Sequence, residues 1–286
     1  MAIASASLAY RRSALMTATK VTSKPPSEQV LAARDNFIAF CTAMGKPPAK
    51  HMLEWHNELC TGKDSECLIG IGGANTSILA PRGSAKSTVL GLFAAWMIGR
   101  HAAAKKMLRI LYIAYMVDIS RAKSATIKGI LTSPKYREIF PMVRLSKIKR
   151  SDEYWSIDYE FAGIDTAGEE AFTIACGGLK GAITSKRSQL VLIDDPIKSA
   201  ASINNPDIRR EMEQTWSNVI APTMFQGARA ICLGTRFHFD DIHATLFIPK
   251  NNWKQIVQKA VITDADGRTR SYWPEFWSMK YLNERK

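Results

Sequence analysis

The sequence predicts one large α/β domain with a mainly parallel central sheet flanked by helices on both faces. Its 286 residues suffice for one such domain, or for one domain with a small appendage. The content of 46% hydrophobic and 9% aromatic residues is that of a globular protein with a substantial core. Segments with strand and helix patterns alternate from residue 77 onward, and alternating β and α elements build parallel sheets that are covered on both sides.

The region before the sheet is expected to be helical after a flexible arm. Residues 1–27 contain no acid and are rich in Ala, Ser, Thr and Lys. A mitochondrial transit peptide has a similar composition, but a flexible N-terminal arm is the simpler interpretation. Apolar residues then follow helical spacing over 27–43, and a second amphipathic helix is expected over 51–59.

The sheet itself is expected to begin with a strand–turn–helix unit, residues 77–80, 81–85 and 86–98, followed by a strand at 109–116 and a basic helix near 119–131. Further elements are predicted downstream. They are strands at 155–161 and 171–176 joined by a turn at 163–168, a Gly-rich loop at 177–181, a strand at 189–194, a polar helix at 207–219 and a strand at 228–233.

The turn of the first unit has the composition of a phosphate-binding loop. Backbone N–H groups at the start of a helix bind phosphates, and the helix dipole favours anions there. In this interpretation Lys86 reaches the β- and γ-phosphates of ATP, and the hydroxyl of Ser87 binds Mg²⁺. The motif departs from G-x-x-x-x-G-K-[ST], because Ala80 and Ala85 occupy the two glycine positions. The residues expected to bind the nucleotide are Pro81, Arg82, Gly83, Ser84, Ala85, Lys86, Ser87 and Thr88.

A pair of acids follows an apolar strand about a hundred residues downstream. Residues 190–193 are Leu-Val-Leu-Ile, and Asp194 and Asp195 come directly after them. Carboxylates at the carboxyl end of a parallel strand face the crevice in which α/β proteins bind ligands. Asp194 is expected to hold the Mg²⁺, and Asp195 to polarise the attacking water as general base. The alternative is a surface Asp-Asp turn.

A third element ends the strand at 228–233. Gly234, Thr235 and Arg236 follow it directly, and a polar residue at such a strand tip can sense the γ-phosphate and relay hydrolysis to a moving part. Thr235 suits that role. The nearby cluster of His238, Asp240, Asp241 and His243 has the residue types of a metal site, although a solvated acidic turn is the favoured interpretation.

The distribution of charge indicates the class of partner, and the cysteines and apolar runs indicate the environment of the protein. The net charge of +13 is uneven, since residues 100–150 hold thirteen lysines and arginines against two acids, Asp118 and Glu138. Such a local excess is typical of proteins that bind nucleic acid; the alternative is a solvated basic face. Five scattered cysteines indicate reduced thiols, and no apolar run is long enough to cross a bilayer, so membrane integration is not expected.

With these elements in place, the sequence resembles the ATPase domain of the large terminase subunit, the DNA-packaging motor of tailed bacteriophages. The likeness covers most of the chain from about residue 45. Its motifs are 81–88, 178–181, 190–196, 233–238 with Asp240 and Asp241, and 273–275. It implies a P-loop NTPase fold of the ASCE type, with ATP and Mg²⁺ as ligands, over residues 28–265. Residues 266–286 would form a linker toward a nuclease domain.

The resemblance also implies roles that the residues alone do not indicate. Arg82 matches the arginine inside the terminase phosphate loop, which makes a contact within the same subunit. Arg187 matches a basic residue that serves in some terminases as an arginine finger toward the adjacent subunit. Gly234, Thr235 and Arg236 match the coupling motif. Terminase adenine pockets often use a glutamine upstream of the loop; the sequence has none there, so His51 or another group is expected to replace it.

The function expected from the resemblance is ATP-driven translocation of double-stranded DNA into a procapsid. The implied partners are DNA, further copies of the chain in a pentameric ring, the portal protein and the small terminase subunit. The implied location is the host cytoplasm, transiently at the portal vertex, without secretion. Two alternatives stay open, a helicase- or repair-type DNA-dependent ATPase and a non-catalytic nucleic-acid-binding module.

Overall fold

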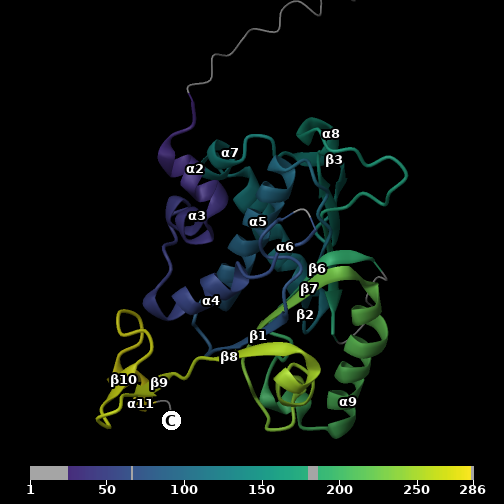
Figure 1. Cartoon of the computed structure of the whole chain (residues 1–286). Coiled ribbons are helices and arrows are strands. Elements are labelled where there is room, and N and C mark those ends of the chain that lie inside the picture. The colour runs from purple at the N-terminus through teal and green to yellow at the C-terminus, as the bar shows by residue number, and fades with distance from the viewer. Residues whose placement is uncertain (1–24, 66, 180–185, 285–286) are drawn as a thin grey trace, which may run out of the picture.

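The computed structural model describes residues 25–65, 67–179 and 186–284 (Figure 1). Most of the expected N-terminal arm, and part of the Gly-rich loop at 177–181, therefore lie outside the described residues. The main sheet has eight strands in the order β3-β4-β5-β2-β6-β7-β1-β8. The six strands from β5 to β8 run parallel, whereas β4 runs antiparallel to both of its neighbours. The predicted fold class, a mainly parallel sheet between helices, is confirmed.

The six inner strands of the main sheet correspond to predicted strands. In chain order the strands are β1 (Asn75–Leu79), β2 (Ile110–Ala114), β3 (Leu145–Arg150), β4 (Tyr154–Ile157), β5 (Ile174–Gly178), β6 (Ser188–Asp194), β7 (Met224–Gly234) and β8 (Trp253–Val257). The outer strands β3 and β8 were not predicted.

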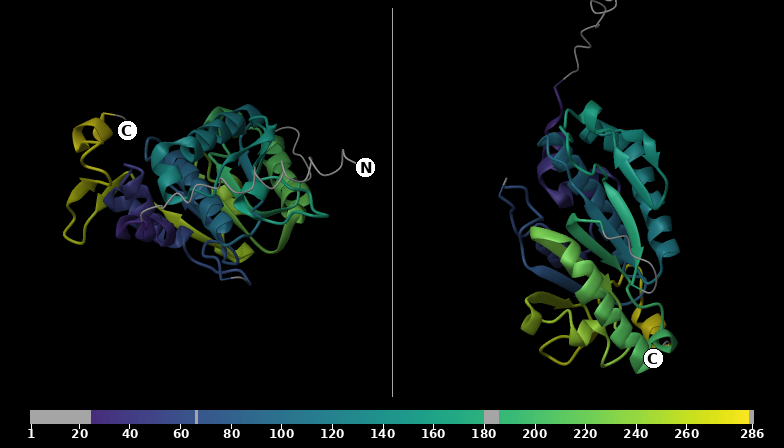
Figure 2. Two further views of the ribbon diagram at one scale, coloured as in Figure 1. Left: turned by 90° about the horizontal axis from the view of Figure 1, so that it is seen from above. Right: turned by 90° about the vertical axis from the view of Figure 1, so that its right-hand side faces the viewer.

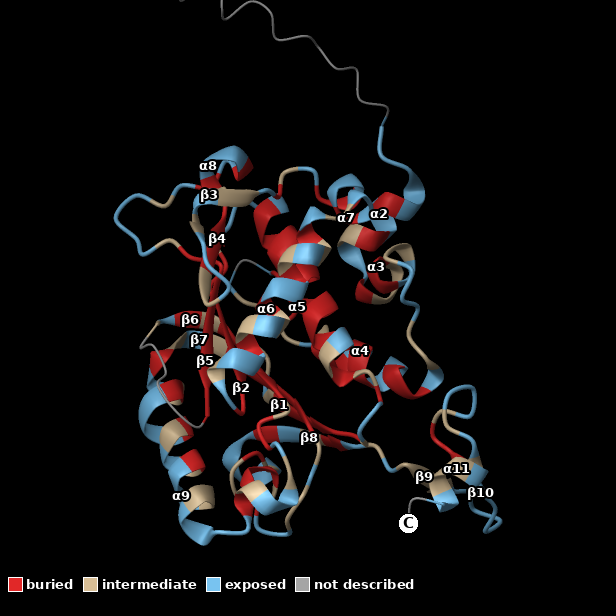
Figure 3. Ribbon diagram, turned by 180° about the vertical axis from the view of Figure 1, so that it is seen from behind, coloured by how far each residue is buried: buried red, intermediate tan, exposed pale blue. Residues whose placement is uncertain are grey.

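One face of the sheet carries the larger part of the core. Helix α5 (Lys86–Ala103) packs against β6, β7 and α6 (Val117–Thr132). It is buried along most of its length (Figure 3). Around it lie α2 (Glu28–Asp35), α3 (Phe37–Ala43), α4 (Leu53–Leu59) and α7 (Pro134–Ile139). A helix that is apolar on nearly all sides belongs in the interior, which explains why the predicted unit at 86–98 lies at the centre of the fold.

The opposite face is covered by α9 (Pro206–Gln214), which continues into a π-helical segment (Thr215–Ile220). Figures 1 and 2 show α9 on the other side of the sheet from α5 and α6. Strand β2 contributes to the core on both faces of the sheet, because its side chains point alternately to the two faces. Ile110 and Tyr112 belong to the core cluster around α5, while Leu111 and Ile113 belong to the second cluster, with Trp216.

Two predicted elements differ from the structure for local reasons. The strand expected at 155–161 ends at Ile157, because Asp158 caps the short helix α8 (Tyr159–Ala162) by accepting from Phe161 N. The helix expected at 27–43 divides at Asn36, whose side chain caps α3 instead. Side-chain caps of this kind compete with continuation of the preceding element.

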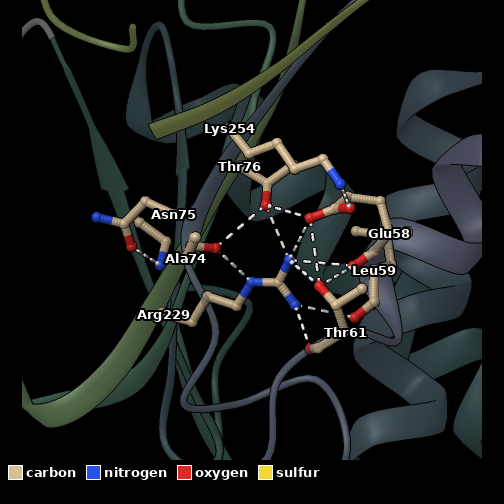
Figure 4. Close-up of polar contacts among 9 residues, drawn as sticks. Glu58, Leu59, Thr61, Ala74, Asn75, Thr76, Arg229 and Lys254 are labelled. Atoms are coloured by element: carbon tan, nitrogen blue, oxygen red, sulfur yellow. Dashed lines mark hydrogen bonds and ion pairs between the residues drawn. The ribbon is translucent and has the colours of Figure 1, made fainter. Parts of the chain in front are cut away.

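A buried ion pair joins α4 to the sheet (Figure 4). Arg229, on β7, is completely buried and donates hydrogen bonds to the carbonyls of Ala74, Leu59 and Thr61 at 2.8–3.1 Å. Its guanidinium lies 3.4 Å from Glu58 Oε1, and the other oxygen of Glu58 pairs with Lys254 on β8. Burial lowers the pKa of Arg229. The cluster fixes α4 against the sheet near the amino end of β1, whereas the phosphate loop follows the carboxyl end of that strand.

The C-terminal residues form a small unit beside the sheet, drawn in yellow in Figure 1. Strands β9 (Val261–Thr263) and β10 (Thr269–Ser271) make an antiparallel hairpin, followed by α11 (Met279–Asn283). The predicted division after residue 265 falls in the hairpin turn, and the linker role of 266–286 stays a prediction. Among the residues that the structure describes, no helix is long and apolar enough to span a membrane.

Candidate nucleotide site

The phosphate-loop segment connects the end of β1 to the start of α5. Gly83 has φ +75° and Ala85 has φ +61°, so both occupy the left-handed region. For alanine this conformation costs on the order of 1–2 kcal/mol, which explains why glycine is usual at that position. Ser84 is buried and donates to Pro81 O at 2.7 Å. The loop thus has the compact turn that was predicted, at the cost of strain at Ala85.

The ammonium group of Lys86 lies inside this loop. It donates to the carbonyls of Ala80 (3.2 Å) and Pro81 (3.0 Å) and to Thr235 Oγ1 (2.9 Å). It also lies 3.7 Å from Asp195 Oδ1. Burial lowers the pKa of Lys86, and the charge of Asp195 opposes that shift. A buried cation held only by carbonyls, a hydroxyl and one nearby carboxylate is well placed to bind an anion.

Ser87 and Asp194 meet as predicted. Ser87 Oγ donates to Asp194 Oδ1 at 2.9 Å, and the hydroxyl of Tyr112 donates to Oδ2 at 3.0 Å. Asp194 is almost fully buried. Desolvation, and secondarily the charge of Asp195, raise its pKa. The Ser87 hydroxyl and the Asp194 carboxylate thus lie side by side. Mg²⁺ binds oxygen ligands of this kind together with phosphate oxygens.

Asp195 differs from its neighbour in exposure and backbone. Its φ is +44°, its N–H donates to Leu233 O at 2.9 Å, and its side chain is 44% exposed. The carboxylate faces Lys86, while its buried Oδ1 has no hydrogen-bond partner among the described residues. The two acids therefore have different environments: one is buried and oriented by two hydroxyls, and the other is open to the cavity.

Strand β7, which carries the third motif, lies between β1 and β6. This order brings Thr235 beside the loop, where its hydroxyl accepts from Lys86 and donates to Ala80 O at 3.1 Å. Gly234 has no room for a side chain, since a Cβ there would lie 2.6 Å from the ring of His243. Arg236 instead turns to the carbonyls of His238 and Phe239. Of the three predicted coupling residues, Thr235 alone contacts Lys86.

Lys86, Ser87, Asp194 and Asp195 line one cavity of about 450 Å³. Arg82 forms part of its wall, where its guanidinium donates to Lys198 O at 2.5 Å and lies 4.8 Å from the centre of the Phe237 ring. The lining residues are Arg82, Gly83, Ser84, Ala85, Lys86, Ser87, Thr88, Tyr115, Ile119, Lys123, Asp194, Asp195, Ile197, Lys198 and Phe237. Tyr115, Ile119, Lys123, Ile197, Lys198 and Phe237 were not predicted, because their place depends on strand order rather than on any local motif.

Several predicted residues do not line this cavity. Pro81, Gly234, Thr235 and Arg236 lie next to residues that do, whereas Arg187 and His51 have other surroundings. Arg187 precedes β6 and therefore lies at the opposite end of the strand from Asp194, with its guanidinium 4.9 Å from the centre of the Phe225 ring. Its role toward an adjacent subunit stays a prediction. His51 is packed among Trp55, Tyr272 and Trp273 and does not line the cavity.

The cluster at 238–243 is built around a helix cap. Asp241 is buried and accepts hydrogen bonds from the N–H groups of Phe237, His238 and His243, which begins α10 (Ile242–Thr245). The favoured solvated turn is thus wrong for Asp241, whereas Asp240 is exposed and pairs with Arg209. In the described part of the chain, no group of three or more His, Cys, Asp or Glu side chains is arranged to hold a metal ion.

Part of the basic excess at 100–150 is neutralised within the fold. Arg121 pairs with Glu153 and Asp118, and Lys128 pairs with Asp152. Other members lie near the sheet edge at β3, where Arg137 and Arg144 line an open cavity of about 510 Å³. All five cysteines are free, as predicted.

Comparison with known proteins finds distant likeness in structure and none in sequence. No protein-family model and no curated protein matches the sequence. The structure matches solved structures of phage large terminase ATPase domains. A variant of that domain from Thermus phage P74-26 is 15% identical, with a TM-score of 0.44, and the match covers 77% of this chain and 85% of that one. The N-terminal domain of the DNA packaging ATPase from bacteriophage phi29 is 12% identical, with a TM-score of 0.39, over 70% and 90% of the two chains.

A third match is the large terminase of a thermophilic bacteriophage in complex with ATP-gamma-S. It is 10% identical, with a TM-score of 0.40, and the match covers 82% of this chain and 44% of that one. The chain therefore spans less than half of that large terminase.

Proposed function

We propose that this chain is the ATPase motor domain of a viral terminase that translocates double-stranded DNA into a procapsid. The observation that carries the proposal is the convergence of Lys86, Ser87, Asp194 and Asp195 on one cavity, with Thr235 hydrogen-bonded to Lys86 behind it. These residues follow three adjacent strands. An ammonium, a hydroxyl and two carboxylates in different environments are the groups that phosphoryl transfer from ATP to water requires.

The residues fit a magnesium–nucleotide complex. Ser87 and Asp194 would hold the Mg²⁺, which neutralises phosphate charge when bound. The N–H groups of the loop and the start of α5 would bind the phosphates. Lys86 would exchange its contacts with Ala80 and Pro81 for phosphate oxygens, which would satisfy its buried charge better than carbonyls do.

Asp195 is the group of the pair suited to act as general base. Its partly exposed carboxylate can accept a proton from water, whereas both oxygens of Asp194 already accept hydroxyl donors. Arg82, at the cavity wall, would stabilise transferred charge within the same subunit after leaving Lys198 O. Arg187 would act on the site of the adjacent subunit in a ring, since head-to-tail contacts bring different surfaces of neighbouring copies together.

Thr235 would couple hydrolysis to movement. Its hydroxyl contacts both Lys86 and the carbonyl of Ala80, so a shift of the ammonium toward phosphate changes the contacts of the β7 tip. Gly234, held tightly against His243, and Arg236, bonded to the following loop, would transmit that change to the segment at 237–245.

Double-stranded DNA, further copies in a pentameric ring, the portal protein and the small terminase subunit are the partners of this function, in the host cytoplasm at the portal vertex. Arg137 and Arg144, which line the cavity near β3, would supply phosphate contacts for DNA. Affinity for DNA should then fall with salt with a slope of about −0.9 for each neutralised phosphate, and salt-independent binding would contradict this role.

The decisive experiment compares steady-state ATP hydrolysis by the wild type and by Asp195→Ala, each with and without duplex DNA. The proposal predicts DNA-stimulated turnover that Asp195→Ala removes. Equally poor hydrolysis by both proteins would favour a non-catalytic nucleic-acid-binding module, in line with Ala85 and Asp195 replacing the usual glycine and glutamate. Strand separation on a forked duplex without any capsid would favour a helicase- or repair-type ATPase.

A further inference from the structure

The C-terminal unit reaches the phosphate loop through one aromatic side chain. The indole N–H of Trp277, which lies between β10 and α11, donates a hydrogen bond to Gly83 O at 3.3 Å. The two residues also pack closely, because a Cβ at Gly83 would lie 2.5 Å from Cζ2 of Trp277. Trp277 does not line the cavity of the nucleotide site. It therefore contacts the loop from outside that cavity.

Other rings hold Trp277 in place. Tyr281 stacks on it, with the ring centres 4.8 Å apart and the planes 24° from parallel. Phe276 meets it edge-on at 4.9 Å and stacks in turn on Trp273 at 4.8 Å. The series of rings, here called the aromatic cluster, consists of Trp55, His51, Trp273, Phe276, Trp277 and Tyr281.

The aromatic cluster is anchored in the core through His51. The ring of His51 lies 4.9 Å from that of Trp273 and 5.3 Å from that of Trp55, which is fully buried on α4. Burial lowers the pKa of His51, and the backbone of Ser84 and the charge of Glu275 oppose that shift. A neutral imidazole packs among aromatic rings without an uncompensated charge. Trp277 is thus connected to the core by continuous ring contacts.

The phosphate loop needs a support that does not depend on Lys86. The backbone of Ala85 is left-handed, a conformation that persists for a residue other than glycine only where the surrounding structure holds it. Within the loop, Lys86 donates to two backbone carbonyls. In the proposed reaction Lys86 leaves these carbonyls for phosphate oxygens. The hydrogen bond from Trp277 to Gly83 does not involve Lys86, so it can persist when nucleotide is bound.

Resting on the proposed ATPase function, we propose that Trp277 is a positioning residue for the phosphates of the bound nucleotide. It holds Gly83 from outside the cavity, so that the N–H groups of the loop stay directed at the phosphates after Lys86 has moved. Donors that are already in place lower the cost of ordering the site on binding. Trp277 acts through the loop backbone, and its effect should therefore be the same for every ligand that carries the triphosphate.

The test compares ATP with inorganic triphosphate, which has the phosphates but no base or ribose, by calorimetric titration with Mg²⁺ present. Trp277→Phe keeps an aromatic ring and removes the N–H donor. A hydrogen bond of ordinary strength corresponds to about 2- to 10-fold in affinity, and both compounds should bind more weakly by the same factor in this range. Trp277→Ala, which also removes the ring, should weaken both at least as much. Lys280→Ala, at an exposed position of α11, is the control and should bind both like the wild type.

A double-mutant cycle with Gly83→Ala distinguishes a direct contact from a general effect of the C-terminal unit. The added methyl group collides with the Trp277 ring, so Gly83→Ala alone should weaken triphosphate binding. In the Trp277→Ala background the ring is absent, and the same substitution should weaken binding by a smaller factor. Equal factors in the two backgrounds would contradict a direct action of Trp277 on the loop.

Circular dichroism of each variant verifies that the fold is intact. Unchanged triphosphate affinity in both Trp277 variants, or weaker binding of ATP alone, would overturn the positioning role while leaving the phosphate site standing. Failure of the wild type to bind either compound would overturn the proposed function together with it.

Discussion

The hydroxyl of Ser87 donates a hydrogen bond to the carboxylate of Asp194 at 2.9 Å, although 107 residues separate the two. One begins the helix after β1 and the other ends β6, with β7 between these strands. The contact joins the two halves of the predicted nucleotide site, and Lys86 and Thr235 lie directly beside it.

The first prediction concerns the ammonium group. Lys86→Ala removes the charge expected to contact the β- and γ-phosphates, and a hydrogen bond to a charged group is worth about 1.5–3 kcal/mol. ATP affinity should therefore fall about 10- to 100-fold in calorimetric titration. Lys250→Ala, at an exposed position far along the chain, is the control and should bind like the wild type. Unchanged binding by Lys86→Ala would disprove the loop assignment.

The second prediction follows from the raised pKa of Asp194. The folded chain holds a proton on this carboxyl more tightly than the unfolded chain does, so stability is lost as the pH rises through the folded pKa. Asp194→Asn removes that cost and keeps an oxygen acceptor. The nucleotide-free variant should melt higher than the wild type at pH 7, by about 2–4 °C for each kcal/mol gained.

This gain should shrink as the pH falls toward the unfolded pKa of 3.8, because the wild-type carboxyl is then protonated in both states. The same variant should lose ATP turnover. Asp35→Asn, at an exposed helix end, is the control and should leave both properties unchanged. A lower melting temperature of Asp194→Asn at pH 7 would contradict the assigned environment.

The third prediction concerns action between subunits. Arg187→Ala should abolish turnover without weakening ATP binding, since the side chain lies away from its own cavity. An arginine finger contributes about 10³–10⁵ in rate. Mixing Arg187→Ala with Asp195→Ala should restore some hydrolysis, because one protein then supplies the base and the other the finger. Lys186→Ala, the adjacent cation paired with Glu170, is the matched control. No recovery at any mixing ratio would argue against a trans role.

The fourth prediction concerns the buried ion pair of Figure 4. Glu58→Gln leaves the charge of Arg229 buried without a carboxylate, and breaking such a pair costs about 3–5 kcal/mol. Denaturant unfolding should show this loss. Lys254→Ala removes only the half-exposed partner of Glu58 and should cost at most about 1 kcal/mol. Equal effects of both substitutions would mean that Arg229 does not depend on Glu58.

The sequence predicted the parts of the fold that local patterns specify. The apolar run before Asp194 and the turn before Lys86 each have a short-range signal, and their order along the chain indicates that they meet at one sheet edge. Tyr112 has no such signal: its hydroxyl reaches Asp194 only because β2 pairs with β6. Phe237 and Lys198 are wall residues for the same reason.

Other elements and residues were not predicted for a different reason. The strands β9 and β10 have three residues each, too few to show alternation. Trp277 lies over Gly83 although 194 residues separate them. Asp241 looked like part of a surface acid cluster, yet it is buried, because three backbone N–H groups satisfy its carboxylate. Such compensation depends on the folded loop and cannot be seen in the sequence.

The most direct test of the central claim is a crystal structure with a non-hydrolysable ATP analogue and Mn²⁺ in place of Mg²⁺, with the metal located by its anomalous scattering. The account predicts one metal ion bound to Ser87 Oγ and to phosphate oxygens, with Asp194 in contact directly or through a water molecule and Lys86 on the terminal phosphates. Nucleotide bound elsewhere, or a metal ion away from both Ser87 and Asp194, would contradict it.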